Sequence, residues 1–205
     1  MVLKCLNQKG QTTTIEMLNA MQWIFDNHKK YNINIVCMSF GANPISENDP
    51  LIKGAEVLWN EGIIVVAAAG NSGPEYHTIK SPGSSKKIIT VGSIDDGRNI
   101  NSGLKFDNKI ISIPDFSSRG PAFGLYKPDL LAPGVDVIST SREYGYGKMS
   151  GTSVSTPIVA GVCALIMEEY KNDITPNQVK ELLLDNCHSI GQDRNSEGFG
   201  YLRFE

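Results

Sequence analysis

Apolar and polar positions along the chain fall into blocks that predict alternating helices and strands. Residues 15–27 have the apolar spacing of an amphipathic helix, and the polar residues 11–14 before them are typical of a helix start. Residues 33–40 and 63–69 form short, almost continuously apolar runs, as buried strands do. The first third of the chain therefore predicts a helix and two buried strands.

The same patterning predicts elements along the rest of the chain. We expect helices at 51–60, 153–170 and 176–185, and strands at 1–6, 87–93, 110–113 and 135–139. Thr175 and Pro176 suit the N-cap and first position of the last helix. Residues 95–150, rich in Gly, Pro and Ser, predict surface loops. Strands that are apolar on both faces and separated by helices indicate one α/β domain over residues 1–205, with a mainly parallel sheet sandwiched by helices.

Composition narrows the classes of function. The 205 residues carry a net charge of -3 with scattered Lys and Arg, which argues against a surface for nucleic acid or for an anionic membrane. The longest apolar run, 63–69, is far too short to span a bilayer. No G-x-G-x-x-G motif follows a strand, so a dinucleotide-binding protein is also disfavoured.

The four cysteines indicate neither a metal site nor a disulfide framework. Cys5, Cys37, Cys163 and Cys187 form no C-x-x-C pair and no cluster at metal-ligand spacing, so we predict no metal site. Cys37 and Cys163 lie inside apolar runs and predict small buried side chains. Scattered thiols favour a reducing compartment. Residues 1–10 lack the apolar region of a signal peptide.

The segment around Ser153 carries the clearest chemical signal. A serine at a helix start lies where unpaired N–H groups and the positive end of the helix dipole favour a developing oxyanion. Gly151 allows a tight turn into this helix, and we expect Pro157 in its first turn, where a missing N–H costs little. The local pattern alone is equally compatible with an ordinary capped helix start.

Three motifs in order resemble those of the subtilases, the subtilisin-like serine proteases. They are residues 34–41 (N-I-V-C-M-S-F-G), 64–71 (I-V-V-A-A-A-G-N) and 151–161 (G-T-S-V-S-T-P-I-V-A-G). The linking segments 81–83, 116–121 and 127–134 are also similar to subtilases, so the resemblance covers essentially the whole chain. It implies a serine endopeptidase with Ser153 as nucleophile and Asn71 in the oxyanion hole. Val154 and Ser155 depart from the Met and Ala usual in the family.

The resemblance also implies a cleft for an extended peptide. Its substrate-binding residues would be Ser39, Phe40, Gly41, Ala68, Ala69 and Gly70. The first three would present backbone groups to the peptide, and the small side chains of the others would leave room for a large apolar group. Phe40 is equally compatible with core packing, and Asn71 taken alone with a turn. Calcium often accompanies the family, but no acidic cluster in the sequence predicts a site, so we predict no cofactor.

A serine nucleophile needs a base and an orienting carboxylate, and the family motifs for both are absent from this sequence. Subtilases carry D-[ST]-G and then H-G-T before the nucleophile. None of His28, His77 and His188 precedes Gly-Thr, and we interpret all three as surface or loop residues, with His77 the one nearest the expected cleft. The resemblance thus implies the C-terminal two-thirds of a catalytic domain, with its N-terminal part absent and the isolated chain inactive.

Expectations about partners and location follow. Without the first strands of the family the sheet would have an open edge, so we expect either a missing N-terminal segment carrying Asp and His or self-association, besides a peptide or protein substrate. Residues 31–33 and 70–74 most resemble the bacterial intracellular type, which implies a cytoplasmic protein, or a secreted one if a signal peptide lies upstream. The alternative function is a pseudoprotease or peptide-binding module without turnover.

Overall fold

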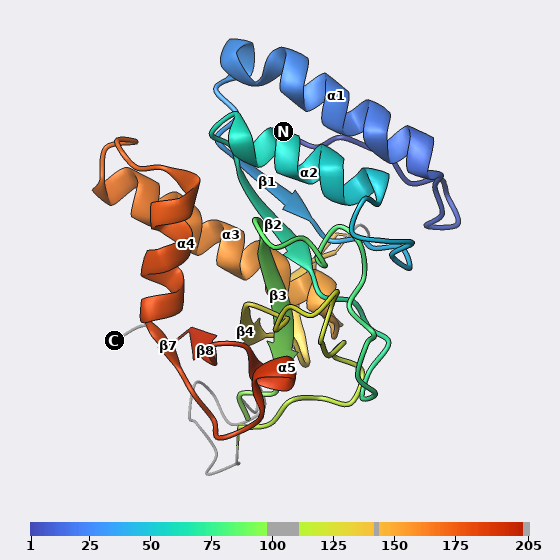
Figure 1. The fold of residues 1–205 in the computed structure, drawn as a ribbon, viewed down its shortest axis with the longest axis vertical. Coiled ribbons are helices and arrows are strands. Elements are labelled where there is room, and N and C mark those ends of the chain that lie inside the picture. The colour runs from blue at the N-terminus through green and yellow to red at the C-terminus, as the bar shows by residue number, and fades with distance from the viewer. Residues whose placement is uncertain (98–110, 142–143, 203–205) are drawn as a thin grey trace.

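The computed structural model describes residues 1–97, 111–141 and 144–202, and their arrangement is shown in Figure 1. In chain order the elements are α1 (Thr14–Tyr31), β1 (Ile35–Met38), α2 (Pro50–Asn60), β2 (Ile64–Ala68), β3 (Ile89–Ile94), β4 (Leu130–Pro133), β5 (Val137–Thr140), β6 (Tyr146–Met149), α3 (Thr152–Glu169), α4 (Pro176–Asp185), β7 (Cys187–His188), α5 (Arg194–Glu197) and β8 (Tyr201–Leu202).

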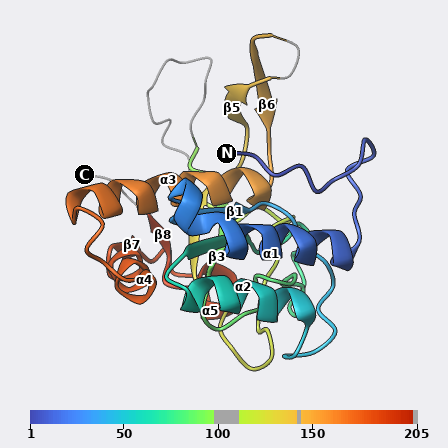
Figure 2. The ribbon, with the colours of Figure 1, turned by 90° about the horizontal axis from the view of Figure 1, so that it is seen from above.

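Six of these strands form one sheet in the order β1-β2-β3-β4-β8-β7. The first five strands in this order run parallel, and β7 pairs antiparallel with β8 at one edge. β5 and β6 form a separate antiparallel hairpin. Figure 2 shows α3 on one face of the sheet and α1 and α2 on the other. The predicted α/β fold, a mainly parallel sheet sandwiched by helices, is therefore confirmed.

Local sequence explains where the helices begin. At α1 the Thr13 hydroxyl accepts a hydrogen bond from the Glu16 N–H, and the Glu16 carboxylate accepts one from the Thr13 N–H. Thr175 and Gln178 form the same reciprocal pair at α4, where Pro176 takes the first helical position. The predicted N-cap and start of this last long helix are confirmed.

The hydrophobic core lies along the middle of the sheet. Every residue of β2 and β3 is buried, and α3 packs Val159, Val162 and Cys163 against them. Burying each large aliphatic side chain contributes about 1.5–3 kcal/mol. The core thus fixes the central strands and the helix that carries Ser153 as one rigid unit.

Three local predictions are wrong. Residues 1–6 form no strand, because no neighbouring strand pairs with them in the described part of the chain. Residues 111–113 form only an isolated bridge, between Ser112 and Asp95, and residue 110 lies outside the described residues. Cys37 is exposed because β1 is an edge strand, whereas Cys163 is buried as predicted.

Residues 95–150 contain more regular structure than the surface loops predicted. β4 lies among them, paired between β3 and β8 and buried at Leu130, Leu131 and Ala132. The predicted strand 135–139 is present as β5, but the pattern does not predict its partner β6. An element of four residues gives no periodic signal, so β4 depends on neighbours that are distant in sequence.

Candidate active site

Ser153 lies in the first turn of α3 and forms a reciprocal pair of hydrogen bonds with Ser39. The Ser153 hydroxyl donates to the backbone carbonyl of Ser39, with 3.1 Å between the oxygens. The Ser39 hydroxyl donates in return to the backbone carbonyl of Ser153, at 2.9 Å. Because Ser39 directly follows β1, this pair joins the carboxyl end of the edge strand to the start of the helix.

Pro157 explains why the Ser153 carbonyl can accept that hydrogen bond. Proline has no N–H, and it lies four residues after Ser153, where another residue would donate to this carbonyl. The prediction that Pro157 falls in the first turn is wrong, because α3 already begins at Thr152. The missing donor therefore matters, and the Ser39 hydroxyl replaces it.

The Asn71 side chain is anchored to the same turn through Thr152. Its carbonyl oxygen accepts hydrogen bonds from the backbone N–H and from the hydroxyl of Thr152, both at 2.9 Å. The Thr152 hydroxyl in turn accepts from the Gly70 N–H at 3.2 Å. With its oxygen engaged twice, Asn71 keeps its NH₂ group available as a donor.

Gly151 brings this NH₂ group close to the start of the helix. Gly151 is the N-cap of α3 and has a φ of 149°, which suits glycine. A Cβ added there would lie 3.2 Å from the Asn71 amide nitrogen, so the two chain segments approach closely. The Ser153 N–H has no acceptor among the described residues. An amide NH₂ and free N–H groups at a helix N-terminus suit stabilisation of an oxyanion.

The predicted substrate-binding residues after β1 border a groove. Ser39, Phe40 and Gly41 line a concave region of about 410 Å³, which α1 bounds through Thr14 and Met17. Phe40 also packs against the main core, so both of its predicted roles have a structural counterpart. Their roles in substrate binding stay predictions.

The predicted residues after β2 are more enclosed. Ala68 is 3% exposed, and Ala69 is fully buried against Ile79 and Ala122. Gly70 has a φ of 113°, and a Cβ there would lie 2.5 Å from a carbon of the Lys80 side chain. Gly70 therefore requires glycine for both space and conformation. Whether these three residues contact a substrate stays a prediction.

None of the three histidine rings forms a hydrogen bond with Ser153. His28 lies 2.7 Å from the Phe25 carbonyl and 3.6 Å from Glu61, while His188 packs against the Tyr201 ring. His77 is exposed in its loop and has a φ of 64°. Among the described residues, the Ser153 hydroxyl thus has the Ser39 carbonyl, and no histidine, as its hydrogen-bond partner.

Ser155, which departs from the usual alanine, has a structural role. It is fully buried, and its hydroxyl forms a hydrogen bond of 2.9 Å with the Ser93 hydroxyl on β3. Gly134 packs beside this pair, where a Cβ would lie 2.2 Å from the Ser155 oxygen. The departure therefore adds a satisfied polar contact between α3 and the sheet.

Comparisons with known proteins identify the family. The family model described as the subtilase family matches residues 1–201. The chain belongs to the subtilase family. It is 39% identical over 226 residues to serine protease AprX of Bacillus subtilis, covering 99% of this chain and 50% of AprX. It is 31% identical over 191 residues to subtilisin DY of Bacillus licheniformis, covering 92% of this chain and 61% of that protein.

The solved structure of the subtilase-like protein sphericase agrees. It superposes with a TM-score of 0.81 at 26% identity, over 98% of this chain and 66% of sphericase. The predicted family is thereby confirmed. This subtilase spans about half the length of AprX, so about half of that relative has no counterpart here.

Thr152 is the site residue that the sequence patterns do not reveal. Its place between Gly151 and Ser153 is the only local signal, and its partners Asn71 and Gly70 are 81 and 82 residues away. The described residues contain no group of three or more His, Cys, Asp or Glu that could hold a metal ion. In this part of the subtilase no helix is long and apolar enough to cross a membrane.

Proposed function

We propose that this chain is the nucleophile-bearing part of a subtilisin-like serine endopeptidase. Ser153 attacks the carbonyl of a peptide bond and forms an acyl-enzyme, and Asn71 donates a hydrogen bond to the oxyanion. One observation carries the proposal: Asn71 is anchored through Thr152 to the N-terminal turn of α3, the turn that also carries Ser153. Such rigid placement of donor and nucleophile is what acyl transfer requires.

The substrate is an extended segment of a peptide or protein. Its backbone pairs with residues 39–41, in the manner of an added strand. A side chain of the substrate enters the groove beside Phe40 and Gly41. Its other walls include residues 10–14 and Met17 and Leu51. The groove contains no charged side chain, which favours an uncharged group.

The general base comes from polypeptide outside these 205 residues. Two histidines are engaged elsewhere, and none of the three forms a hydrogen bond with Ser153. The missing segment would carry the Asp and His of the family motifs, so the isolated chain hydrolyses no peptide. About a third of sphericase has no counterpart in this chain, which supports a missing segment of that size.

A second candidate function is a pseudoprotease or peptide-binding module without turnover. It is favoured by the hydrogen bond that the Ser153 hydroxyl donates to the Ser39 carbonyl, since a backbone carbonyl cannot accept the proton as a base does. In this alternative the cleft binds peptides and Ser153 only contributes to its structure.

We further propose a reducing, cytoplasmic location, with secretion as the alternative if a signal peptide lies upstream. All four cysteines are free thiols. Burial raises the pKa values of Cys163 and Cys187 to about 12, so both stay protonated and unreactive near neutral pH. Their protection fits structural thiols in a protein that forms no disulfides.

A fluorophosphonate serine-hydrolase probe tests the endopeptidase. We expect it to label Ser153 only when the chain is co-expressed with the segment encoded in frame upstream of Met1. Ser153→Ala should abolish labelling, whereas Ser139→Ala, a matched change at an exposed serine of β5, should leave it intact. Labelling of the chain alone would show that a base is already present, with His77 as the first suspect. Absence of labelling in both conditions would favour the pseudoprotease.

Asn71→Ala tests the oxyanion hole in the complemented protease. An oxyanion-hole asparagine of subtilisin sets the scale, because its loss lowers kcat by roughly 10²–10³. We expect a loss of this order with little change in KM, measured on a chromogenic peptide. Asn48→Ala, at an exposed asparagine of the loop between β1 and α2, serves as the matched control. A change confined to KM would mean that Asn71 binds substrate rather than the transition state.

A further inference from the structure

Lys80 lies between the two chain segments that carry the predicted substrate-binding residues. Its backbone N–H donates to the Ala69 carbonyl at 2.8 Å, in the segment that follows β2. The next residue, Ser81, exchanges two backbone hydrogen bonds with Ala42, in the segment that follows β1. The backbone at Lys80 is thus fixed from both sides, so its side chain starts from a defined position.

Two of the predicted substrate-binding residues are glycines against which the Lys80 side chain packs. A Cβ added to Gly41 would lie 2.6 Å from the Lys80 Cβ, and a Cβ added to Gly70 would lie 2.5 Å from the Lys80 Cγ. Carbon atoms in contact are normally about 3.5–4.0 Å apart, so neither glycine has room for a side chain. The first carbons of the Lys80 side chain therefore occupy the space between the two segments.

The ammonium group of Lys80 extends beyond this packed stem. Lys80 is half-buried, and its ammonium donates a hydrogen bond to the side-chain oxygen of Asn43, an exposed residue. Among the described residues no carboxylate forms an ion pair with this ammonium. An apolar stem packed on backbone, with an unpaired charge at its accessible tip, suits the binding of an anion.

The same two segments border the reacting groups of the candidate active site. Gly70 directly precedes Asn71, and Gly41 lies two residues after the serine that forms two hydrogen bonds with Ser153. A substrate carbonyl placed between Ser153 and Asn71 has its nearest side chain at the opening between these segments. That side chain meets Lys80 there, because the Lys80 stem lies against both glycines.

We propose that Lys80 selects substrates with an acidic side chain, Asp or Glu, on the residue whose carbonyl Ser153 attacks. The inference rests on the proposed function, because Ser153 defines the attacked carbonyl. The substrate carboxylate replaces the Asn43 oxygen as acceptor of the ammonium, and the new hydrogen bond is stronger because both partners are charged. The small residues after β2 alone predict room for a large apolar group, but the Lys80 stem takes up the space beside Gly70.

The Lys80 position is separate from the groove beside Phe40. Lys80 is not among the residues that line that groove, and no lining residue has a charged side chain. Successive side chains of an extended peptide point to opposite faces, and separate sites for them give specificity. One extended substrate therefore places an uncharged side chain in the groove and an acidic side chain at Lys80.

Four chromogenic peptides test this selection in the chain complemented by its upstream segment. They differ only in the residue before the nitroanilide leaving group, which is Glu, Gln, Leu or Lys, and the measurement is kcat/KM. At pH about 7 the glutamate side chain is ionised, whereas glutamine has almost the same shape without the charge. We expect Glu to exceed Gln by about tenfold, the effect of one hydrogen bond to a charged group, and Lys to be the poorest substrate.

Variants at Lys80 separate the charge from the stem. Lys80→Met keeps an unbranched apolar side chain and removes the charge, so it should abolish the preference for Glu over Gln and raise kcat/KM for Leu. Lys80→Ala also shortens the stem and should favour Leu further, because it opens the space beside Gly70. Lys86→Met, at an exposed lysine before β3, is the matched control and should leave the preference unchanged.

Salt separates charge recognition from shape. Raising the ionic strength from about 0.1 M to about 1 M shortens the Debye length from about 10 Å to about 3 Å, which weakens an exposed ion pair. The ratio of kcat/KM for Glu to that for Gln should therefore fall with salt in the wild type and stay constant in Lys80→Met. Equal values for Glu and Gln in the wild type, or a preference for Glu that survives in Lys80→Met, would overturn the role of Lys80.

Binding without turnover distinguishes this inference from the proposed endopeptidase. Fluorescence anisotropy gives the Kd of labelled Glu and Gln peptides for Ser153→Ala, with and without Lys80→Met. Tighter binding of Glu that depends on Lys80, without cleavage by the wild type, would uphold the selection and overturn the endopeptidase. Cleavage without discrimination would do the reverse. Absence of both binding and cleavage would overturn both.

Discussion

The two edges of the main sheet are completed to different degrees. At one edge β8 and β7 extend the sheet, and buried charges inside it are paired. At the other edge β1 is half exposed beside an uncharged groove. Ser39 and Ser153 meet at the carboxyl end of β1, so the candidate nucleophile lies on the unfinished side. The candidate nucleophile therefore lies beside the edge strand that has one neighbouring strand among the described residues.

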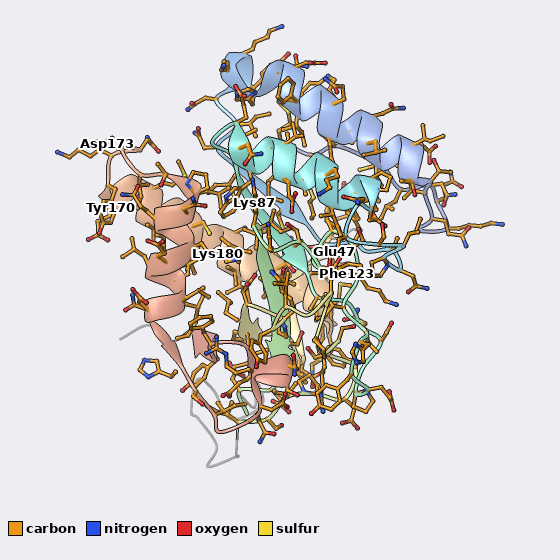
Figure 3. The ribbon with its side chains drawn as sticks, viewed as in Figure 1. Glu47, Lys87, Phe123, Tyr170, Asp173 and Lys180 are labelled. Carbon is orange, nitrogen blue, oxygen red and sulfur yellow. The ribbon has the colours of Figure 1, made fainter. Side chains whose placement is uncertain are left out.

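The completed side is held by three charged residues. Lys127 is 1% exposed, and its ammonium lies 2.7 Å from Asp129 and 2.9 Å from the Thr90 hydroxyl. Lys180 reaches from α4 to Asp129 at 3.0 Å and donates to the Lys87 carbonyl at 3.2 Å. Figure 3 labels Lys180 and Lys87 among the side chains. One carboxylate thus joins β4 to α4, and every charge in the cluster has a partner.

Removing the carboxylate of Asp129 should give the largest loss of stability. Asp129→Asn leaves the buried Lys127 without its counter-charge, which costs about 3–5 kcal/mol. Asp136→Asn is the matched control, since Asp136 pairs with Lys148 at 3.0 Å with both side chains more than half exposed, and should cost about 0–1 kcal/mol. Urea unfolding measures both. Equal losses in the two variants would contradict the view that the completed edge depends on a buried charge.

The pH dependence of stability also tests whether the completed edge depends on buried charges. We expect its effect on the free energy of unfolding to be smaller than that of Asp129→Asn. Burial lowers the pKa of Lys127 to about 8, although Asp129 opposes the shift. An unfolded lysine titrates near about 10.4. Between these values the unfolded chain retains a proton that the folded chain has released, so the free energy of unfolding rises with pH across this window.

The measurement compares wild type with Lys127→Met in urea at pH about 7.5 and about 9.5. Because other groups titrate equally in both proteins, the difference between them reports Lys127, and it should increase toward the higher pH. On the acid side the sign is opposite. Burial alone would raise the pKa of Asp129, but Lys127 and Lys180 outweigh it and hold it below its usual value. Stability from this carboxylate is therefore lost only as the pH falls through that lowered pKa.

The sequence predicts the fold where a single element carries its own signal. Residues 63–69 are apolar at every position, and the corresponding strand, β2, is buried throughout. β4 is hidden because its four residues lie among Pro, Gly and Lys and are buried by β3 and β8, which are distant in sequence. Cys37 shows the opposite error, because its side chain is predicted to be buried and is exposed. An apolar run predicts a buried strand, but it does not reveal that β1 lies at the edge of the sheet.

The candidate site divides in the same way. Motif resemblance brings Ser153 and Asn71 to attention as single residues, each within its own segment. Asn71 contacts Thr152 across 81 residues of sequence, and Ser153 contacts Ser39 across 114, so no local pattern encodes either contact. Pro157 gives a similar lesson. Its sequence position suggests a first-turn proline whose missing N–H costs little. In the structure it lies inside α3, and the Ser153 carbonyl accepts a hydrogen bond from the Ser39 hydroxyl instead.

Ser39→Ala should give the smallest effect, and it tests how the unfinished edge holds the nucleophile. The change removes the donor to the Ser153 carbonyl, and one such hydrogen bond contributes about 1 kcal/mol. Pro157→Ala restores a backbone N–H four residues after Ser153, so adding Ser39→Ala to that variant should cost much less. Urea unfolding of the four proteins measures the coupling as a double-mutant cycle. If the two changes are additive, Ser39 does not substitute for the missing proline N–H, and β1 positions Ser153 through the Ser39 carbonyl alone.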